Sequence, residues 1–446
     1  MGQRGRILAQ VVGLPGFKVK DAYFESAAGQ RIEPVAGFDV DRSALLVVCL
    51  ERRWAARCAK CFAIGGGRHG RGHRRRWRDL PWGEHGVVLE YAPERVACKR
   101  CDSRGVELLH WAEPHQRQTK RFQQHLALDA FSMPLIHVAT KYGLAWHSVR
   151  RAELAAIARW EATRKDVPLE QVGIDEKWLG RRHKLEHKFV TIISNLATGE
   201  PIWSGYGRDA DTVKRWLATL SADDKARIKL FAMDMHKPFM NAVREDPALA
   251  HAVVAHDTFH IVKRAGEAIT ELRREQFFRA GPELRAVGRG ARWLVLRAWE
   301  RQSPEDQARL KALFAINGKL ARAYQVVEEL RGVLRTAPDR SSLETGLWHV
   351  LYRTEKRANV PMRKLHESLK EHFHEIAAIG EHRPPTGRIE ALNTNWEALV
   401  RRARGYRDHE YLRRKLRFTI ANPVRSVDGT RRFLALGIPA PTARAA

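Results

Sequence analysis

The apolar positions between residues 171 and 257 fall in short runs, and three of these runs lead to an aspartate. "QVGIDEKW" reaches Asp175, "IKLFAMD" reaches Asp234 and "HAVVAHD" reaches Asp257. Short apolar, β-branched runs of this kind predict buried strands, here ending at each aspartate. "HKFVTIISNLATGEPIW" predicts a hairpin around "ATGE", and helical spacing follows in "DADTVKRWLATL" and "KPFMNAVRED". The predicted order is therefore β-β-β-α-β-α-β.

An opening three-stranded meander followed by βα units resembles the ribonuclease-H-like fold, an α/β class. In that fold the first and fourth strands are neighbours, so Asp175 and Asp234 would meet at adjacent strand ends. Two buried carboxylates at close range repel each other unless cations lie between them. A pair of Mg²⁺ ions about 4 Å apart would resolve the repulsion and create a phosphoryl-transfer site. The alternative is that each aspartate only caps the helix that follows it.

Helical spacing dominates on both sides of this region. "TKRFQQHLALDAFSM" predicts one helix, and "PLIHVATKYGLAWHSVRRAELAAIARW" predicts a short helix, a turn at Gly143 and a longer helix. This arrangement is typical of a helix-turn-helix, whose second helix would enter the major groove, although a hairpin that only packs has the same pattern. The expected DNA contacts near the start of that helix are His147, Ser148, Arg150 and Arg151. After Asp257 the pattern stays helical for over a hundred residues, and a further helix after Pro384-Pro385 carries Glu390.

Four of the five cysteines form two C-x-x-C pairs, "CAKC" and "CKRC". Thiolates at this spacing select zinc in a tetrahedral site, and the strands predicted between the pairs complete a zinc ribbon. Disulfides or a redox pair are the alternatives, and both are disfavoured in a cytosolic protein. His69 and His73 could compete as ligands, but a four-thiolate site needs neither. The expected zinc ligands are Cys58, Cys61, Cys98 and Cys101.

The stretch "GGGRHGRGHRRRWR", from Gly65 to Arg78, predicts a glycine-rich loop between the two cysteine pairs. Its arginines are expected to contact DNA phosphates or a minor groove, and a merely solvated basic loop is the alternative. The whole chain has a formal charge of +28, which favours a nucleic-acid partner. The expected contacts in this stretch are Arg68, Arg71, Arg74, Arg75 and Arg76.

A chain of 446 residues is expected to hold several domains. We expect no membrane span, because the longest clean apolar run is "ALLVVCL", and no targeting segment, hence a cytoplasmic protein with access to DNA. The expected segments are a zinc-ribbon DNA-binding domain (1–115), a helix-turn-helix (116–165), a first part of the ribonuclease-H-like core (166–262), a helical insertion (263–380), a second core part (381–424) and a tail (425–446).

Several blocks, in order along nearly the whole chain, resemble bacterial insertion-sequence DDE transposases of the ISL-three type. The resemblance begins with "GLPGFKV" and the paired C-x-x-C, and ends with "RARGYRDHEYLRRKL". "GIDEKW", "DMHKPF" and "GRIEALN" match the blocks of the three catalytic acids, which implies Asp175, Asp234 and Glu390. "HDTFHIVK" implies supporting roles for Asp257 and His260, and Asn393 lies beside the third acid. The family usually has Glu-Gly-Leu-Asn where this chain has "EALN".

The resemblance implies a transposase that binds the terminal inverted repeats of its element, cleaves at the ends by metal-dependent hydrolysis, and joins the 3′ ends to target DNA. It implies Mg²⁺ or Mn²⁺ at the three acids, double-stranded DNA as partner, and a homo-oligomer, most simply a dimer, because both ends must be held at once. Two alternatives stay open: a catalytically inactive DNA-binding regulator on the same scaffold, and a ribonuclease-H-like DNA nuclease.

Overall fold

The computed structural model describes residues 12–33, 40–64, 67–165, 167–179, 188–279, 281–355, 359–403 and 405–438. The chain forms two compact units that each draw on distant parts of the sequence. Unit 1 comprises Met1–Lys165, Val400–Tyr406 and Ala421–Ala446, and unit 2 comprises Asp166–Leu399 and Arg407–Ile420. Within the described ranges, no helix combines the length and the apolar character that a membrane crossing requires.

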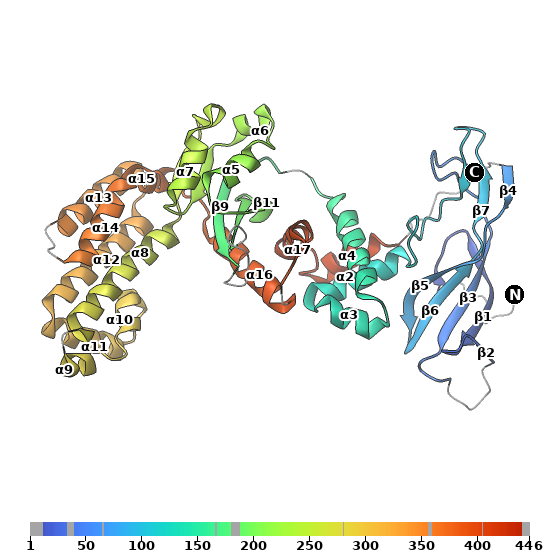
Figure 1. The fold of residues 1–446 in the computed structure, drawn as a ribbon, viewed down its shortest axis with the longest axis horizontal. Helices are drawn as coiled ribbons and strands as arrows, with labels where there is room; N and C mark the ends of the chain where they lie inside the picture. Colours follow the sequence, from blue (N-terminus) through green and yellow to red (C-terminus); the bar gives the residue numbers. More distant parts are fainter. Residues whose placement is uncertain are drawn as a thin grey trace. The chain divides into compact units, whose positions relative to one another are not determined.

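Unit 1 begins with a five-stranded sheet of order β2-β1-β3-β6-β5, drawn in blue in Figure 1. Apolar side chains on one face of the strands, among them Val48, Trp77 and Leu89, form its core with Trp111 from the segment that follows. The strand bounds are β1 Phe17–Glu25, β2 Arg31–Ile32, β3 Leu45–Arg52, β5 Arg75–Trp82 and β6 His85–Tyr91. A three-stranded sheet of order β4-β7-β8 accompanies it, with bounds β4 Gly67–Arg71, β7 Glu94–Ala97 and β8 Arg104–Val106.

The prediction of a loop from Gly65 to Arg78 was wrong, because β4 and the start of β5 lie within this stretch. Residues of β5 alternate in burial: Trp77 and Asp79 are buried, whereas Arg76 lies on the other face. Arg76 donates to both oxygens of Glu25, at 2.8 Å each, and to Glu90 at 3.0 Å. These acids come from β1 and β6, so partners distant in the sequence stabilise a strand that local composition disfavours.

The predicted helix-turn-helix region is confirmed as three helices, α2 Lys120–Ser132, α3 Leu135–Tyr142 and α4 Trp146–Glu161. Gly143 ends α3 in the left-handed conformation, with φ of 59°, and so allows the tight turn into α4. Thr119 caps α2 and donates to the buried Asp79 at 2.6 Å, and Arg121 also pairs with Asp79. The carboxylate of Asp79 therefore attaches the helices to the edge strand β5.

The segment from residue 425 onward, expected as a tail, contains a helix, α18 Val427–Ala435. It packs against α2 within unit 1, where Gln124 donates to the carbonyl of Phe433 at 2.6 Å. Residues 439–446, at the end of the expected tail, lie outside the described residues.

Unit 2 contains a mixed five-stranded sheet of order β11-β10-β9-β12-β13. The first three strands form an antiparallel meander, and β12 pairs in parallel with both β9 and β13. The strand bounds are β9 Gln171–Trp178, β10 Phe189–Asn195, β11 Glu200–Tyr206, β12 Leu230–Met233 and β13 Val253–His256. Helices α5 Ala210–Leu217, α6 Ala222–Arg227 and α7 Lys237–Arg244, with the short turn η2 Pro247–Leu249, connect the last strands. The predicted order is thus confirmed, with α6 and η2 added.

The predicted helical stretch after Asp257 is confirmed, and its helices bury a core of their own around Ile261, Leu330 and Leu347. The larger helices lie side by side in the yellow-to-orange part of Figure 1. Their bounds are α8 Thr258–Arg273, η3 Arg274–Phe278, α9 Pro282–Val287, α10 Arg292–Leu296, η4 Trp299–Arg301, α11 Pro304–Ile316, α12 Gly318–Thr336, α13 Arg340–Glu355, α14 Val360–Glu371 and α15 Phe373–His382.

Two more helices, α16 Gly387–Ala403 and α17 His409–Ala421, follow the helical stretch. The first half of α16 packs on the sheet, where Ile389 forms a small buried cluster with Leu196 and Ala232. α17 lies beside β11, because Arg417 pairs with Glu200 at 2.8 Å. The sheet therefore receives a helix from nearly two hundred residues further along the chain.

Candidate functional site

Asp175 lies on β9, and Asp234 directly follows β12, the neighbouring parallel strand. In the register of these two strands, Met233 is opposite Ile174. The next residues along the chain, Asp234 and Asp175, are therefore also neighbours. One expected detail was wrong: β9 does not end at Asp175 but continues to Trp178, because β10 pairs with it over its whole length. Asp175 therefore projects from the body of a strand, whereas Asp234 directly follows one.

The Asp175 carboxylate is almost fully buried, with 8% of the residue exposed. Burial raises its pKa, since desolvation disfavours the charged form, and a hydrogen bond donated by the Asn393 side chain opposes this rise. The backbone N–H of Glu176 donates to the other oxygen at 2.9 Å. Both carboxylate oxygens thus accept a hydrogen bond, which fixes the orientation of the group.

Asn393 reaches Asp175 because α16 runs along β9. Four helical residues advance about 6 Å and two strand residues advance about 6.6 Å, so the two repeats nearly match. Ile389 packs over Gly173, Asn393 donates to Asp175, and Glu397 accepts from Lys177 at 3.1 Å. These three pairs place one face of the helix over one face of the strand.

Glu390 lies on α16 one turn before Asn393 and nearly two turns before Glu397, so it borders the face that meets β9. Its side chain is exposed. Among the described residues, the carboxylate oxygens of Asp175, Asp234 and Glu390 do not all lie within 4.8 Å of one another. Glu390 thus lies on the helix that contacts Asp175 through Asn393, and its membership of a metal site with the two aspartates stays a prediction.

Asp257 and His260 surround Asp234. His260 Nδ1 lies 3.4 Å from a carboxylate oxygen of Asp234, and its Nε2 lies 3.9 Å from Asp257. Asp257 caps α8 by accepting from the N–H of Phe259 at 2.9 Å, so the capping alternative holds for this residue. It does not hold for Asp234, whose side chain does not cap α7.

Sequence reasoning missed a further carboxylate, Glu176. Burial raises its pKa, and the charges of Asp175 and Asp234 raise it further. One of its oxygens is buried without a hydrogen-bond partner. The only signal in the sequence was a second acidic residue in "GIDEKW", which by strand alternation points to the opposite face from Asp175.

The chemistry of this donor set suits a divalent cation. Mg²⁺ and Mn²⁺ prefer carboxylate oxygens, and close carboxylates in a partly desolvated site repel one another without a counterion. Burial raises the pKa of Asp175, burial and the charges of Asp175 and Asp234 raise the pKa of Glu176, and one Glu176 oxygen has no hydrogen-bond partner, so a nearby cation would favour the charged forms of these acids. The residues present therefore fit the metal that the sequence predicts.

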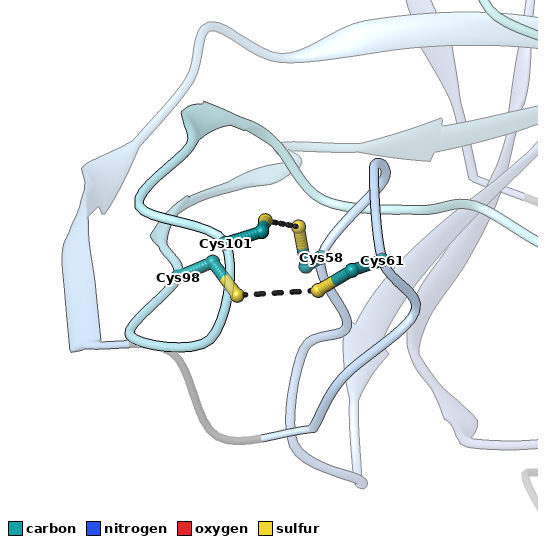
Figure 2. A group of neighbouring side chains, drawn as sticks. All are labelled: Cys58, Cys61, Cys98 and Cys101. Carbon is teal, nitrogen blue, oxygen red and sulfur yellow. Dashed lines mark hydrogen bonds between the residues drawn. The ribbon is translucent and has the colours of Figure 1, made fainter.

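The four cysteines of the paired C-x-x-C motifs converge in unit 1, as Figure 2 shows. Their sulfur atoms are 3.7 Å apart between Cys58 and Cys101, and 3.5 Å apart between Cys61 and Cys98. Sulfurs around a tetrahedral zinc at 2.3 Å would be separated by about 3.8 Å. These distances exclude disulfides and fit a zinc site.

The Ser103 hydroxyl bonds to both Cys58 and Cys101, at 3.2 and 3.0 Å. This hydrogen bond is the main cause of a lowered pKa in both thiols, that of Cys58 being about 6, whereas burial and the neighbouring thiols raise the pKa of Cys61 to about 11. His73 is exposed and is not part of the cysteine group, and the side chain of His69 lies outside the described residues.

The residues expected to contact DNA lie in unit 1. His147 and Arg151 are exposed on the first turns of α4, and Ser148 and Arg150 are half-buried there. Arg71 at the end of β4, Arg75 at the start of β5 and Arg74 in the connection between them are exposed, and the side chain of Arg68 lies outside the described residues. Arg76 and Arg74 pair with acids of the sheet, so Arg71 and Arg75 are the better candidates for phosphate contacts.

Comparisons with known proteins find relatives across most of the chain. A family model described as a transposase matches residues 172–416, and one described as the helix-turn-helix domain of transposase family ISL3 matches residues 107–156. The chain is 29% identical over 350 residues to the transposase for insertion sequence element IS1001 of Bordetella parapertussis, covering 77% of this chain and 84% of that protein. It is 27% identical over 373 residues to the transposase for insertion sequence element IS1557 of Mycobacterium tuberculosis, covering 76% and 80%.

Proposed function

Because the chain belongs to the ISL3 family of insertion-sequence DDE transposases, we propose that it binds the terminal inverted repeats of its own element, cleaves DNA at the element's ends and joins the 3′ ends to target DNA. The family's reaction is polynucleotidyl transfer, and its helix-turn-helix implies DNA binding. The proposal rests mainly on two observations: the strand register makes Asp175 and Asp234 neighbours, and Asn393 of α16 donates a hydrogen bond to Asp175.

In this proposal the sheet of unit 2 is a ribonuclease-H-like core. Support comes from the strand order, in which the fourth strand pairs in parallel with the first at the level of the two aspartates. The division expected from the sequence belongs to the proposal: ribbon to residue 115, helix-turn-helix to 165, core at 166–262 and 381–424, and helical insertion at 263–380. Within the second core part, residues 400–406 and 421–424 are the exception, because they belong to unit 1.

Asp175, Asp234 and Glu390 would hold the divalent ions. When bound, Mg²⁺ or Mn²⁺ supplies a Lewis acid that activates water or a 3′-hydroxyl and stabilises charge on the scissile phosphate. Asn393 keeps the Asp175 carboxylate in one orientation. His260, placed between Asp234 and Asp257, restrains the Asp234 carboxylate from the other side.

The DNA-binding part of the proposal rests on unit 1. Cys58, Cys61, Cys98 and Cys101 would bind structural zinc and hold the strands that carry Arg71 and Arg75. The first turns of α4, with His147, Ser148, Arg150 and Arg151, would enter the major groove. Two ends must be engaged together, so we propose that the active form is a dimer or larger homo-oligomer.

The experiment combines the full chain, Mg²⁺, a linear DNA that carries the two sequences flanking the gene, and a supercoiled target plasmid. We expect nicking at the element's ends followed by joined products in which element DNA is linked to the plasmid. Nicks without joined products would indicate a nuclease, and binding of the ends without any cleavage would indicate a DNA-binding regulator. Either outcome contradicts the proposed function.

A further inference from the structure

Two histidines and a glutamate meet in the interior of unit 2, apart from both the carboxylate site and the cysteines. His256 is the last residue of β13, and His372 and Glu375 lie at the start of α15. One ligand atom from each lies within 4.8 Å of the other two. The three residues are 0%, 3% and 7% exposed, respectively. Such complete burial of three polar groups needs a physical reason.

Each of the two histidine rings has a buried nitrogen without a hydrogen-bond partner, and the Nε2 of His372 lies 3.9 Å from a carboxylate oxygen of Glu371. His256 Nδ1 lies 3.3 Å from the carbonyl oxygen of Met233, which fixes the proton on Nδ1 and leaves a lone pair on Nε2. His256 Nε2 and His372 Nδ1 are both buried and have no hydrogen-bond partner. The rings are nearly perpendicular, with centroids 4.8 Å apart, so they do not stack on each other. A buried nitrogen without a partner costs about 1–3 kcal/mol, so two of them indicate a missing partner that both could share.

The hydrogen bonds around these residues are of the kind that metal ligands in proteins commonly make. A ligating histidine commonly donates its second ring nitrogen to a carbonyl, as His256 does to Met233, and a ligating carboxylate is itself hydrogen-bonded. Arg244 donates to one oxygen of Glu375, which leaves the other oxygen able to coordinate. Two imidazoles and a carboxylate are a donor set that zinc accepts, with a water as fourth ligand.

We propose that His256, His372 and Glu375 bind a zinc ion that fastens the helical stretch to the sheet. The ion would tie α15 to β13, the strand that ends one residue before Asp257. Its role would be structural, since it holds in place the strand end that supports the carboxylate site. The proposal does not depend on the transposase reaction, because it concerns packing within unit 2.

The test measures zinc bound per chain in the purified full chain after gel filtration. We expect His372→Gln, which keeps the polarity of the side chain, to hold one zinc fewer than the unaltered chain. His374→Gln is the matched control, because His374 lies two residues away on the same helix and is exposed, so its zinc content should be unchanged. Equal zinc content in the unaltered chain and in a folded His372→Gln variant would overturn the proposal and leave a buried water as the shared partner.

A second measurement on the unaltered chain guards against misfolding of the variant. Reconstitution with Co²⁺ in place of zinc, in a large excess of Mg²⁺ to occupy the carboxylate site, should give two kinds of bound cobalt, one with thiolate charge-transfer absorption from the cysteines and one without it. Titration to a single equivalent, with all bound cobalt showing thiolate absorption, would contradict a second site even if His372→Gln failed to fold.

Discussion

The carboxylate of Asp175 is buried, so its negative charge is poorly solvated. Its pKa is raised by burial, so the folded chain binds a proton at this carboxyl more tightly than the unfolded chain does. The contribution of this carboxyl to stability is therefore most favourable below the ordinary pKa of an aspartate, about 3.9, and it is lost as pH rises from there through the folded pKa. Above the folded pKa, the full cost of the buried charge remains unless a cation compensates it.

Asp175→Asn should consequently raise the melting temperature of the metal-free chain by a few degrees at pH 7, and the gain should vanish near pH 4. The Asn393 amide can turn its carbonyl, which has no partner, toward the new side chain. Thermal unfolding without added divalent ions measures this, and added Mg²⁺ should reduce the gain by stabilising the unaltered chain. A lower melting temperature at pH 7 would contradict the uncompensated charge. Asp223→Asn, at an exposed residue of α6, is the control.

At the residue scale, the sequence predicted those side chains whose role follows from their position in a strand. Asp234 was predicted because an apolar run leads directly to it, and the structure places it beside Asp175. The ion pair of Arg76 with Glu25 was not predictable, because the two residues are 51 positions apart and only the sheet brings them together. Asn393 was found through a resemblance, and its bond to Asp175 needed the structure.

At the scale of elements, the central feature is the close packing of α16 on β9. Gly173 permits it: a Cβ there would lie 2.6 Å from Ser194 Oγ, 2.8 Å from Leu196 Cδ2 and 3.0 Å from Ile389 Cγ1. Ser194 and Leu196 belong to the β10 hairpin, whereas Ile389 belongs to α16. A side chain at position 173 therefore has to displace the side chains of Ser194 and Leu196, and it presses on Ile389 of the helix that carries Asn393 and Glu390.

Gly173→Ala should destabilise unit 2 by about 1–3 kcal/mol and reduce end cleavage at least tenfold, because overpacking moves α16 away from Asp175. Binding of end DNA should be retained, since the proposed contacts lie in unit 1. Gly332→Ala is the control: no atom lies within 4 Å of its added Cβ, so its cleavage should be unchanged. A Gly173→Ala variant that cleaves like the unaltered chain would contradict this role of the helix.

At this scale, the sequence predicts the elements that local interactions stabilise and misses those that depend on distant partners. Helices α2, α3 and α4 were predicted well, because their periodicity and the turn at Gly143 are local signals. The basic stretch before Arg78 was taken as a loop on its glycines and arginines, whereas ladders to β6 and β7 make it strand. Cross-strand pairing outweighed local composition there.

At the scale of the whole molecule, the sequence order concealed how the units are assembled. Residues 400–406 and 421–446 join unit 1, although they follow the last residues of the carboxylate site. Nothing in their composition indicates this, because the contact of α18 with α2 depends on backbone approach at Gly437, whose added Cβ would lie 2.7 Å from Arg121 Cα. Dividing the sequence into consecutive domains cannot describe a chain whose last segments pack back into its first unit.

The formal charge of +28 should make binding of end DNA strongly dependent on salt. Arg151→Ala should weaken binding and reduce the slope of log affinity against log salt concentration by about 0.9, as expected for one lost phosphate contact. Titrations of labelled end DNA at several salt concentrations measure both quantities. Arg227→Ala, on α6 of unit 2, should leave the slope unchanged, and an unchanged slope for Arg151→Ala would exclude a phosphate contact at that position.

The most direct measurement is the rate of end cleavage by Asp234→Asn at a DNA concentration that saturates binding. If Asp175, Asp234 and Glu390 act together through divalent ions, losing one carboxylate should slow cleavage at least about a hundredfold while end binding is kept. Asp223→Asn should cleave at the unaltered rate. An Asp234→Asn variant that binds the ends and cleaves them as fast as the unaltered chain would contradict the account.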